Sequence, residues 1–336
     1  MISFKEDHIS QIPALLMLEK LGYTYLTPDE ALALRGGNLA NVLLEPVLRK
    51  QLAAINVVQV SSVRTTVFSE QNITAGIDAL RNIQMDEGFM EASQTVYDLL
   101  TSGKTLEQIV DGDRKSFVMQ YIDWKNPRNN VFHVTEEFAV SRTGMTETYR
   151  PDIVLFVNGI PLCIIECKRP DVKDSIEQAI SQHLRNQKAD GIRSLYLYST
   201  LLLAINRQEG SYATTATPEK FWARWREQFA NREEEARYRQ ELERVVNEPL
   251  LDDKLFGERF GYVRRNFEEL YRQPVTPSVQ DEYLYNLCRP ERLLQLMYGF
   301  TLYDDGIKKV ARYQQYFAVR QTMRRVRHIE GGRRHG

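Results

Sequence analysis

The chain has 336 residues, 43% hydrophobic and 26% charged, which suits one large globular domain or, more readily, two. Its 44 Lys and Arg residues nearly balance 45 Asp and Glu residues, so any contact with nucleic acid requires a local basic patch. Three cysteines without CxxC spacing argue against a disulfide framework or a zinc knuckle.

Two features of the sequence bear on where the protein is located. The first ten residues lack the basic segment and apolar core of a signal peptide. The longest apolar run, around residues 195–205, is too short to span a bilayer. The sequence therefore predicts a cytoplasmic protein with no membrane contact.

The first third of the chain is predicted to be mainly helical. Apolar spacing indicates a helix over 7–21, a second over 38–56 that Pro46 kinks or restarts, and mostly helix over 70–122.

The period then changes to that of strands. Residues 131–140 alternate like a half-buried strand, and two further strands follow within 150–170. A helix over 174–187 precedes the runs SLYLYS and LLLAIN (194–206), which supply at least one more strand. Helix, strands, helix and strand in this order predict an α/β domain with a mixed sheet flanked by helices.

The charged segment 217–247 is predicted to be helical, with a solvated face. In that helix Trp222 and Trp225 would share one face and anchor it to the domain. The segment 271–280 contains two prolines and is typical of a linker.

Residues 150–170, RPDIVLFVNGIPLCIIECKRP, place charged side chains inside an apolar hairpin. Residues two apart in a strand face the same way, so Glu166 and Lys168 project together and Cys167 points away. Asp152 lies on the preceding strand. Two carboxylates at close range favour a cation between them, and hard oxygen ligands suit Mg²⁺. Lys168 could then orient a water or neutralise developing charge.

This shared site depends on the register of the hairpin. A plain two-residue Asn158-Gly159 turn would put Asp152 opposite Ile165, with Glu166 on the other face. A three-residue loop, or a bulge beyond the turn, pairs Asp152 with Glu166. We therefore predict that the hairpin is not a plain two-residue turn. The alternative is a surface hairpin whose Glu and Lys are solvated edge residues.

Pro151-Asp152 and Glu166-Cys167-Lys168 resemble the PD-(D/E)xK nuclease core. Over nearly its whole length the chain is similar to the amino-terminal part of the motor (R) subunit of type I restriction endonucleases. The most specific stretches are RPDIVLFVNGIPLCIIECKRP, DSIEQAISQHLRNQ, YATTATPEKFWARW (212–225) and KKVARYQQYFAV (308–319).

The resemblance implies further site residues. Gln182 and Asn186 match a Gln-x-x-x-Tyr motif, with the tyrosine replaced by asparagine. Glu45 is the best match for a helical glutamate ahead of the core, although Pro46 follows it. Cys167 could offer its backbone carbonyl to the metal.

The last quarter of the chain suggests a second module. Residues 308–336 hold nine Lys and Arg and one Glu. In this segment Arg312, Gln315 and Ala318 fit the R-x-x-Q-x-x-A spacing found ahead of the first nucleotide motif of superfamily 2 motors. The resemblance implies that Gln315 reads the adenine edge of ATP. An amphipathic helix is the plain alternative.

The implied organisation is an endonuclease domain over 1–260, followed over 261–336 by a linker and the short helical start of a motor domain. No GxxxxGK[ST] phosphate-binding loop occurs in the sequence. We therefore expect a truncated subunit, with ATP used only by the full-length protein, that neither binds ATP well nor translocates.

The implied function is Mg²⁺-dependent cleavage of duplex DNA after ATP-driven translocation, in a complex with methyltransferase and specificity subunits. Duplex binding would rest on phosphate contacts and be sensitive to salt. The alternatives are a PD-(D/E)xK nuclease of another DNA-processing system and a catalytically silent DNA-binding module.

Overall fold

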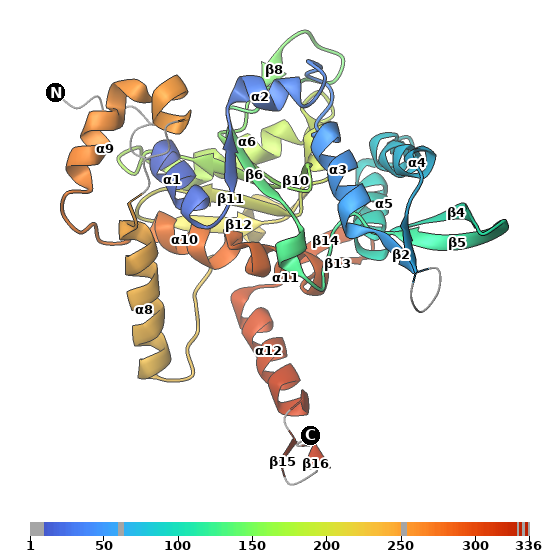
Figure 1. Cartoon of the computed structure of the whole chain (residues 1–336). Helices are drawn as coiled ribbons and strands as arrows, with labels where there is room; N and C mark the ends of the chain where they lie inside the picture. Colours follow the sequence, from blue (N-terminus) through green and yellow to red (C-terminus); the bar gives the residue numbers. More distant parts are fainter. Residues whose placement is uncertain (1–9, 60–63, 250–253, 328, 331–332, 335–336) are drawn as a thin grey trace.

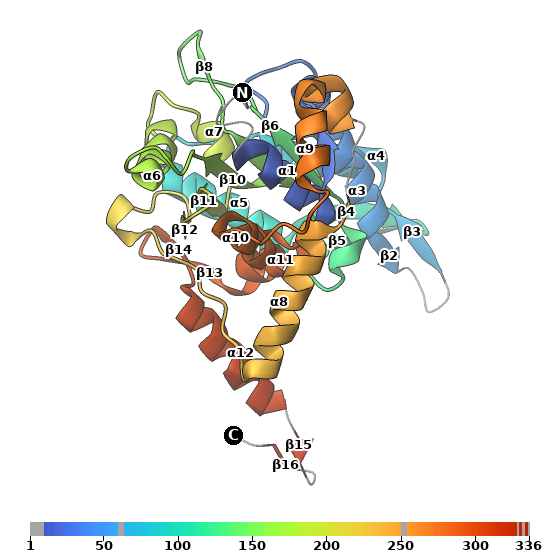
Figure 2. The same cartoon turned by 90° about the vertical axis from the view of Figure 1, so that its left-hand side faces the viewer.

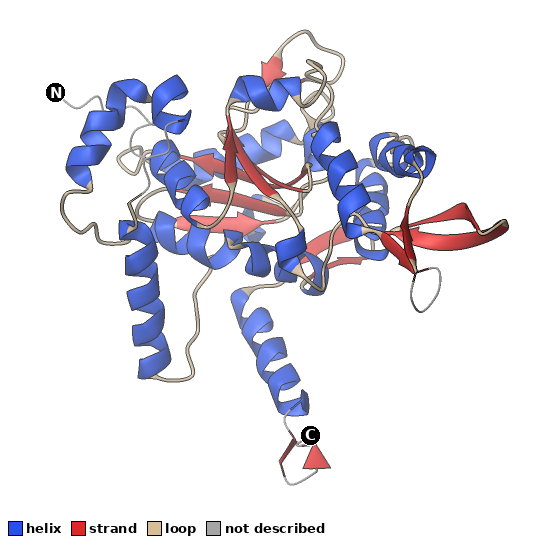
Figure 3. Ribbon diagram, viewed as in Figure 1, coloured by secondary structure: helices blue, strands red, loops and turns tan. Residues whose placement is uncertain are grey.

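A six-stranded mixed sheet forms the centre of the molecule (Figures 1 and 3). The computed structural model describes residues 10–59, 64–249, 254–327, 329–330 and 333–334. The strand order is β1 (Thr24–Leu26), β6 (Phe132–Glu136), β9 (Ile153–Val157), β10 (Ile160–Cys167), β11 (Leu201–Ile205) and β12 (Gly210–Ala213). The pairs β1–β6 and β10–β11 are parallel and the other three are antiparallel. The predicted α/β fold with a mixed sheet is thus confirmed.

Helices cover both faces of this sheet. On one face α6 (Ser175–Asn186) packs on β10 and β11, where Ile176, Ala179 and Ile180 enclose Ala204. On the other face lie α1 (Ile12–Lys20) and α10 (Val279–Cys288), which also pack against each other. Strands β9, β10 and β11 are buried along their whole length because both of their faces are covered.

The remaining elements surround this core. The other helices are α2 (Pro28–Ala33), α3 (Glu45–Ile55), α4 (Glu70–Arg81), α5 (Phe89–Ser102), α7 (Arg193–Tyr196), α8 (Arg232–Asn247), α9 (Arg264–Leu270), α11 (Pro290–Gly299) and α12 (Tyr313–Arg327). The small two-stranded sheets are β2 (Val57–Gln59) with β3 (Thr65–Val67), β4 (Lys104–Val110) with β5 (Asp113–Met119), β7 (Val140–Ser141) with β8 (Thr148–Tyr149), β13 (Thr301–Asp304) with β14 (Ile307–Val310), and β15 (Ile329–Glu330) with β16 (Arg333–Arg334). Helices α8 and α12 project from the same side of the body in both views (Figures 1 and 2).

The helical predictions for the first third of the chain need two corrections. The helix expected from residue 38 begins only at Glu45, because Pro46 occupies its first turn and favours a helix start there. The segment expected to be helical up to 122 ends in the β4–β5 hairpin, whose mostly half-exposed and exposed residues carry little apolar periodicity. The first helix is α1, and residues 7–9 of its predicted span lie outside the described residues.

Two later predictions are also wrong in part. The first three residues of SLYLYS lie in α7 and the other three in no strand, so LLLAIN alone supplies the expected further strand, β11. The charged helix starts at Arg232, where the side chain of Asn231 caps it, and not at Thr217. Trp222 and Trp225 therefore precede the helix. They pack separately, against His183 at 5.3 Å and Tyr316 at 5.4 Å between ring centroids.

A single hydrophobic cluster extends from α1 to α12 and includes α10 and α11. The hydroxyl of Tyr23 donates to the carbonyl of Cys288 at 2.7 Å, which ties the first strand to α10. The segment 272–278 has no regular structure beyond turns, as its prolines predict. The core continues past residue 260, and the division into 1–260 and 261–336 stays a prediction.

In the described part of the chain, no helix combines the length and apolar character that a membrane span requires.

The turn between β9 and β10 is held by specific contacts. Asn158 and Gly159 both have positive φ, +53° and +84°, as a tight hairpin turn requires. The Asn158 side chain donates to the carbonyl of Tyr121 at 3.0 Å and accepts from the N–H of Val131 at 2.9 Å. A Cβ on Gly159 would lie 2.6 Å from the carbonyl oxygen of Leu44. The turn therefore needs glycine for both its φ and its close approach to α3.

Gly159→Ala should therefore destabilise the protein more than the same change at Gly112. Gly112 follows Asp111 in the β4–β5 turn with a similar φ of +86°, but nothing lies within 4 Å of its added Cβ. The strained φ costs roughly 1–2 kcal/mol at either site. Overpacking against the backbone should add about 1–3 kcal/mol at Gly159 only. Urea unfolding of both variants measures the difference, and equal losses would contradict the assigned clash.

Candidate active site

A β-bulge sets the alignment of the two strands that carry the predicted carboxylates. Val157 pairs with Ile160, so the turn itself has two residues. The register shifts between Pro161 and Cys163, which leaves Leu162 as an extra residue in β10. The predicted departure from a plain two-residue turn is confirmed, in the form of a tight turn with a bulge beyond it.

The bulge determines which residues meet at the far end of the hairpin. Beyond it Ile153 lies opposite Ile165, so the next step of the register puts Asp152 opposite Glu166. Opposed residues share a face of the sheet. Glu166 pairs with Ala204, which α6 covers, so both carboxylates lie on the α6 face.

Asp152 is held through both its side chain and its backbone. Its Oδ2 accepts the N–H of Cys167 at 2.7 Å and lies 3.4 Å from Lys168 Nζ. Its main-chain carbonyl accepts the N–H of Glu137 and the Nε2 of Gln11, each at 3.0 Å. The carboxylate therefore has little freedom to move.

Glu166 is fully buried, and its two oxygens differ. Oε2 accepts a 2.6 Å hydrogen bond from Gln182 Nε2, whereas Oε1 has no hydrogen-bond partner among the described residues. Burial, and then the negative charge of Asp152, raise the pKa of Glu166 well above its usual range. A cation beside the two carboxylates would offset both effects and satisfy the unpartnered oxygen.

Lys168 completes the group. Its side chain is only 14% exposed, and its Nζ lies 3.2 Å from the Cys167 carbonyl oxygen in addition to its contact with Asp152. Its own carbonyl accepts the hydroxyl of Ser10 at 2.7 Å, and its N–H donates to Ile205 at 3.0 Å. The ammonium group is thus positioned beside the carboxylates by the strand and by the start of α1.

The residues behind Gln182 form a buried hydrogen-bond network. His183 Nε2 lies 2.9 Å from the carbonyl oxygen of Leu203, to which it must donate, so Nδ1 accepts the hydroxyl of Tyr196 at 3.0 Å. Burial lowers the pKa of His183 to about 4, so the ring is neutral near pH 7. Asn186, in place of the motif tyrosine, accepts from Arg185 at 2.9 Å. The network fixes the face of α6 that presents Gln182.

Glu45 is not brought to this group. It opens α3 beside the Asn158-Gly159 turn, because the N–H of Leu44 donates to the Gly159 carbonyl at 2.9 Å. Its carboxylate is engaged by Arg81 at 3.0 Å. It therefore lies at the turn end of the hairpin, whereas the two carboxylates of the group lie at the opposite end. Pro46 lies in the first turn of α3, directly after Glu45.

The predicted nucleotide residues lie in a separate pocket. Arg312 and Gln315 line a cavity of about 410 Å³ together with Phe221, Ile307 and Val310. The Oε1 of Gln315 accepts the backbone N–H of Arg312 at 2.8 Å. None of the residues of the carboxylate group lines this cavity.

Sequence reasoning missed the residues that support the backbone of the group. Ser10 and Gln11 lie about 140–160 positions from their partners, and Gln280 on α10 donates to the Ser10 carbonyl at 2.8 Å. Nothing in the local pattern could have indicated these contacts. Tyr196 was missed because its segment was expected to be a strand; burial and then the charge of Glu166 raise the pKa of its hydroxyl.

The donor set fits magnesium better than zinc. The candidate ligands are the carboxylates of Asp152 and Glu166 and the backbone oxygen of Cys167, all hard oxygens. In the parts of the chain that the structure describes, no cluster of three or more His, Cys, Asp or Glu side chains is suited to a metal. The three cysteines are buried and form no disulfide.

Comparison with known proteins defines the family. The model of the type I restriction enzyme R protein N terminus matches residues 3–221. The chain therefore belongs to this family, as the N-terminal part of an R subunit.

Two curated relatives extend the match. A Methanocaldococcus jannaschii protein named as a type I restriction enzyme MjaIXP endonuclease subunit is 26% identical over 330 residues, which cover 96% of this chain and 28% of that protein. The type I restriction enzyme HindI endonuclease subunit of Haemophilus influenzae is 25% identical, over 95% of this chain and 26% of its own length. The chain thus spans about a quarter of the length of these relatives.

Glu166→Gln should stabilise the protein in the absence of divalent cations. Because the pKa of Glu166 is raised in the folded state, folding becomes less favourable as pH rises above the usual glutamate range. At pH 7.5 the variant should melt at least about 2 °C higher, roughly the effect of 1 kcal/mol in a protein of this size. The difference in melting temperature between the variant and the wild type should vanish near pH 4.

Calorimetry in EDTA measures this effect, with Glu107→Gln on the exposed face of β4 as the control. Mg²⁺ should raise the melting temperature of the wild type and leave that of Glu166→Gln unchanged. Identical wild-type and Glu166→Gln melting curves at pH 7.5 would show that the buried carboxyl does not lower the stability of the folded protein.

Proposed function

We propose that this chain is the Mg²⁺-dependent endonuclease region of a type I restriction R subunit, which hydrolyses phosphodiester bonds of duplex DNA. The observation that carries the proposal is the bulge-dependent meeting of Asp152 and Glu166 beside Lys168. A buried carboxylate, a second and partly exposed carboxylate, and an ammonium group at one point of a rigid sheet are the minimum set for metal-assisted phosphodiester hydrolysis.

Each residue has a distinct role in this proposal. Asp152 and Glu166 would hold the cation, with the backbone oxygen of Cys167 as a further ligand. Mg²⁺ supplies a bound water of lowered pKa and stabilises charge on the phosphoryl oxygens. Lys168 stabilises the negative charge that develops on the phosphate. Gln182 is a positioning residue, because its 2.6 Å hydrogen bond orients one oxygen of Glu166 and leaves the other free to bind.

The activity of the whole subunit extends this proposal. The relatives are endonuclease subunits by name, and this chain matches only about a quarter of their length. We infer that the full-length subunit cleaves after ATP-driven translocation and assembles with methyltransferase and specificity subunits. Sequence recognition would then lie outside this chain.

Cleavage should depend on the proposed group. Purified chain should nick supercoiled plasmid in Mg²⁺, and Lys168→Ala or Asp152→Ala should reduce the initial rate at least about 100-fold, the scale of losing one group that stabilises charge in the transition state. Lys115→Ala on the β4–β5 hairpin is the matched control and should cleave like the wild type. Gel quantification of nicked circles gives the rates. Equal nicking by all four proteins would overturn the assignment.

We further propose that the cavity beside Gln315 accepts the base of an adenine nucleotide. Its walls include Phe221, Ile307 and Val310, and the N–H donated by Arg312 leaves the amide NH₂ of Gln315 to donate to a base. This element would belong to the start of a superfamily 2 motor domain.

Calorimetric titration with ATP tests this pocket. Gln315→Ala should weaken binding by about fivefold to tenfold, the value of one hydrogen bond of roughly 1–1.5 kcal/mol. Gln314→Ala, which changes the neighbouring exposed glutamine, should bind like the wild type. Equal affinity of the two variants would remove Gln315 from the site.

A further inference from the structure

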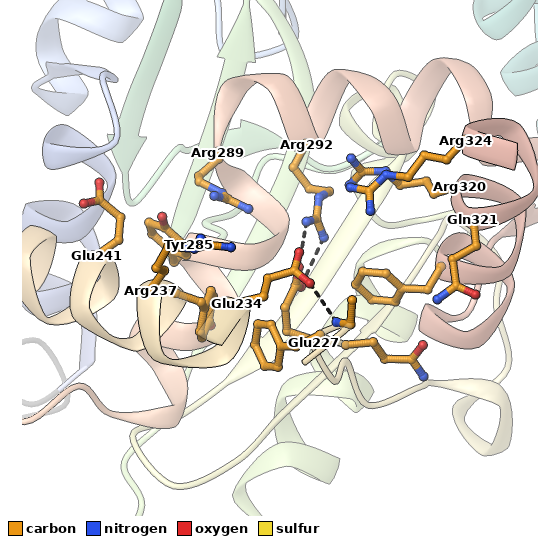
Figure 4. Close-up of a pocket in the computed structure, with 15 residues that line it drawn as sticks. Glu227, Glu234, Arg237, Glu241, Tyr285, Arg289, Arg292, Arg320, Gln321 and Arg324 are labelled. Atoms are coloured by element: carbon orange, nitrogen blue, oxygen red, sulfur yellow. Dashed lines mark hydrogen bonds and ion pairs between the residues drawn. The ribbon is translucent and has the colours of Figure 1, made fainter. Parts of the chain in front are cut away.

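A second pocket is lined by more positive than negative side chains. It has a volume of about 430 Å³ and lies between α8, α12, the start of α11 and the segment 227–230 (Figure 4). We call it the arginine pocket; its basic residues are Arg237, Arg289, Arg292, Arg320 and Arg324. Neither the carboxylate group around Asp152 nor the Gln315 cavity shares a residue with it.

The three glutamates of the pocket are already engaged. Glu227 binds Arg292 through two contacts at 2.8 and 3.2 Å, and both side chains are nearly buried. Glu241 pairs outside the pocket with Arg244 at 2.8 Å. Glu234 accepts the backbone N–H of Ala230 at 2.7 Å. The Glu227–Arg292 pair is therefore neutral and Glu241 is paired with Arg244, whereas Glu234 keeps its negative charge because its partner is a neutral backbone N–H.

Four arginines of the pocket lie outside these ion pairs. Among the residues that the structure describes, Arg237, Arg289, Arg320 and Arg324 form no ion pair with a carboxylate. The Nε of Arg289 is buried without a hydrogen-bond partner, and its guanidinium lies 4.2 Å from the centroid of the Tyr285 ring. Figure 4 shows the guanidinium groups of Arg289, Arg292, Arg320 and Arg324 following one another across the upper part of the pocket.

We propose that the arginine pocket binds phosphate groups of a nucleic-acid backbone. Guanidinium forks match phosphate oxygens in charge and in bidentate geometry. Arginines contributed by α8, the start of α11 and α12 can contact successive phosphates, and each contact releases condensed counterions. With a net charge of −1 on the whole chain, such a local patch is what attraction to DNA requires.

An acidic protein segment is the less favoured occupant. Protein partners normally insert aromatic or apolar anchors at a pocket centre. Of the four rings that line the pocket, Tyr285 is 6% and Phe317 9% exposed, whereas Phe229 and Tyr238 are half-buried. Arginines outnumber glutamates in the lining, and this excess of positive charge favours a polyanion. The choice of duplex DNA as the polyanion rests on the proposed nuclease function.

Fluorescence anisotropy with a short labelled duplex of arbitrary sequence, in EDTA, tests the proposal on the whole chain. Arg320→Gln and Arg324→Gln should each weaken binding at least about threefold, and each should lower the slope of log K against log salt by roughly one. Arg325→Gln is the matched control, since it removes the same charge from the same helix outside the pocket. Melting curves should show all three variants folded.

The outcomes separate this proposal from the nuclease assignment. Lys168→Ala should bind the duplex like the wild type. Loss of binding confined to Arg320 and Arg324 supports the arginine pocket even if no variant ever cleaves DNA. Wild-type binding by both variants, or losses equal to that of Arg325→Gln, would overturn it while leaving cleavage untouched. Displacement of the duplex by a poly-glutamate peptide at equal charge concentration would also overturn it and favour an acidic protein partner.

Discussion

The burial of Glu166 opposite Asp152 is the constraint around which the rest of the site is organised. An ionised carboxylate without solvent access is costly unless it is paired and hydrogen-bonded. Gln182 meets one of its oxygens, Lys168 supplies a positive charge nearby, and the second oxygen is left without a protein partner. A protein selected only for stability would replace such a pair with apolar residues of similar volume. Under the proposed function, a cation would bind the unpartnered oxygen at this one point of the sheet.

The hairpin illustrates how far sequence reasoning reaches. The Asn158-Gly159 pair correctly predicted a tight turn, and the spacing of the acidic residues correctly predicted the alignment of the strands. The bulge at Leu162 allows the tight turn and the alignment of Asp152 with Glu166 to occur together. The chemistry that the carboxylates require predicted either a three-residue loop or a bulge, and the local pattern could not decide between the two or locate the bulge. Both strands are buried on both faces, so they lack the apolar–polar alternation that normally identifies register.

Errors in the sequence-based predictions share a physical cause, which is competition from tertiary contacts. Trp225 lies in a segment of good helical pattern, but its indole is buried between Tyr212 and Tyr316, and the chain is extended to reach them. Glu45 is a glutamate ahead of the core, as the family motif requires. However, α3 begins beside the Asn158-Gly159 turn, so the carboxylate of Glu45 contacts Arg81 and not the carboxylate group. Such contacts join residues far apart in the sequence, so no local sequence pattern could predict them.

The separation of the arginine pocket from the carboxylate pair has an electrostatic consequence. DNA is a dense polyanion, and negative charge on Asp152 and Glu166, which Lys168 offsets only in part, would repel a phosphate that approaches this point. Positive charge on α8, α11 and α12 can attract the backbone without pairing with Asp152 or Glu166 and thereby occupying the cation position. In the proposed function, attraction and chemistry would then rest on different elements: the projecting helices would hold the DNA, and the buried sheet would hold the two carboxylates and the lysine. A cation bound between the carboxylates would remove the local repulsion, so the phosphate would approach them closely only when the proposed metal is present.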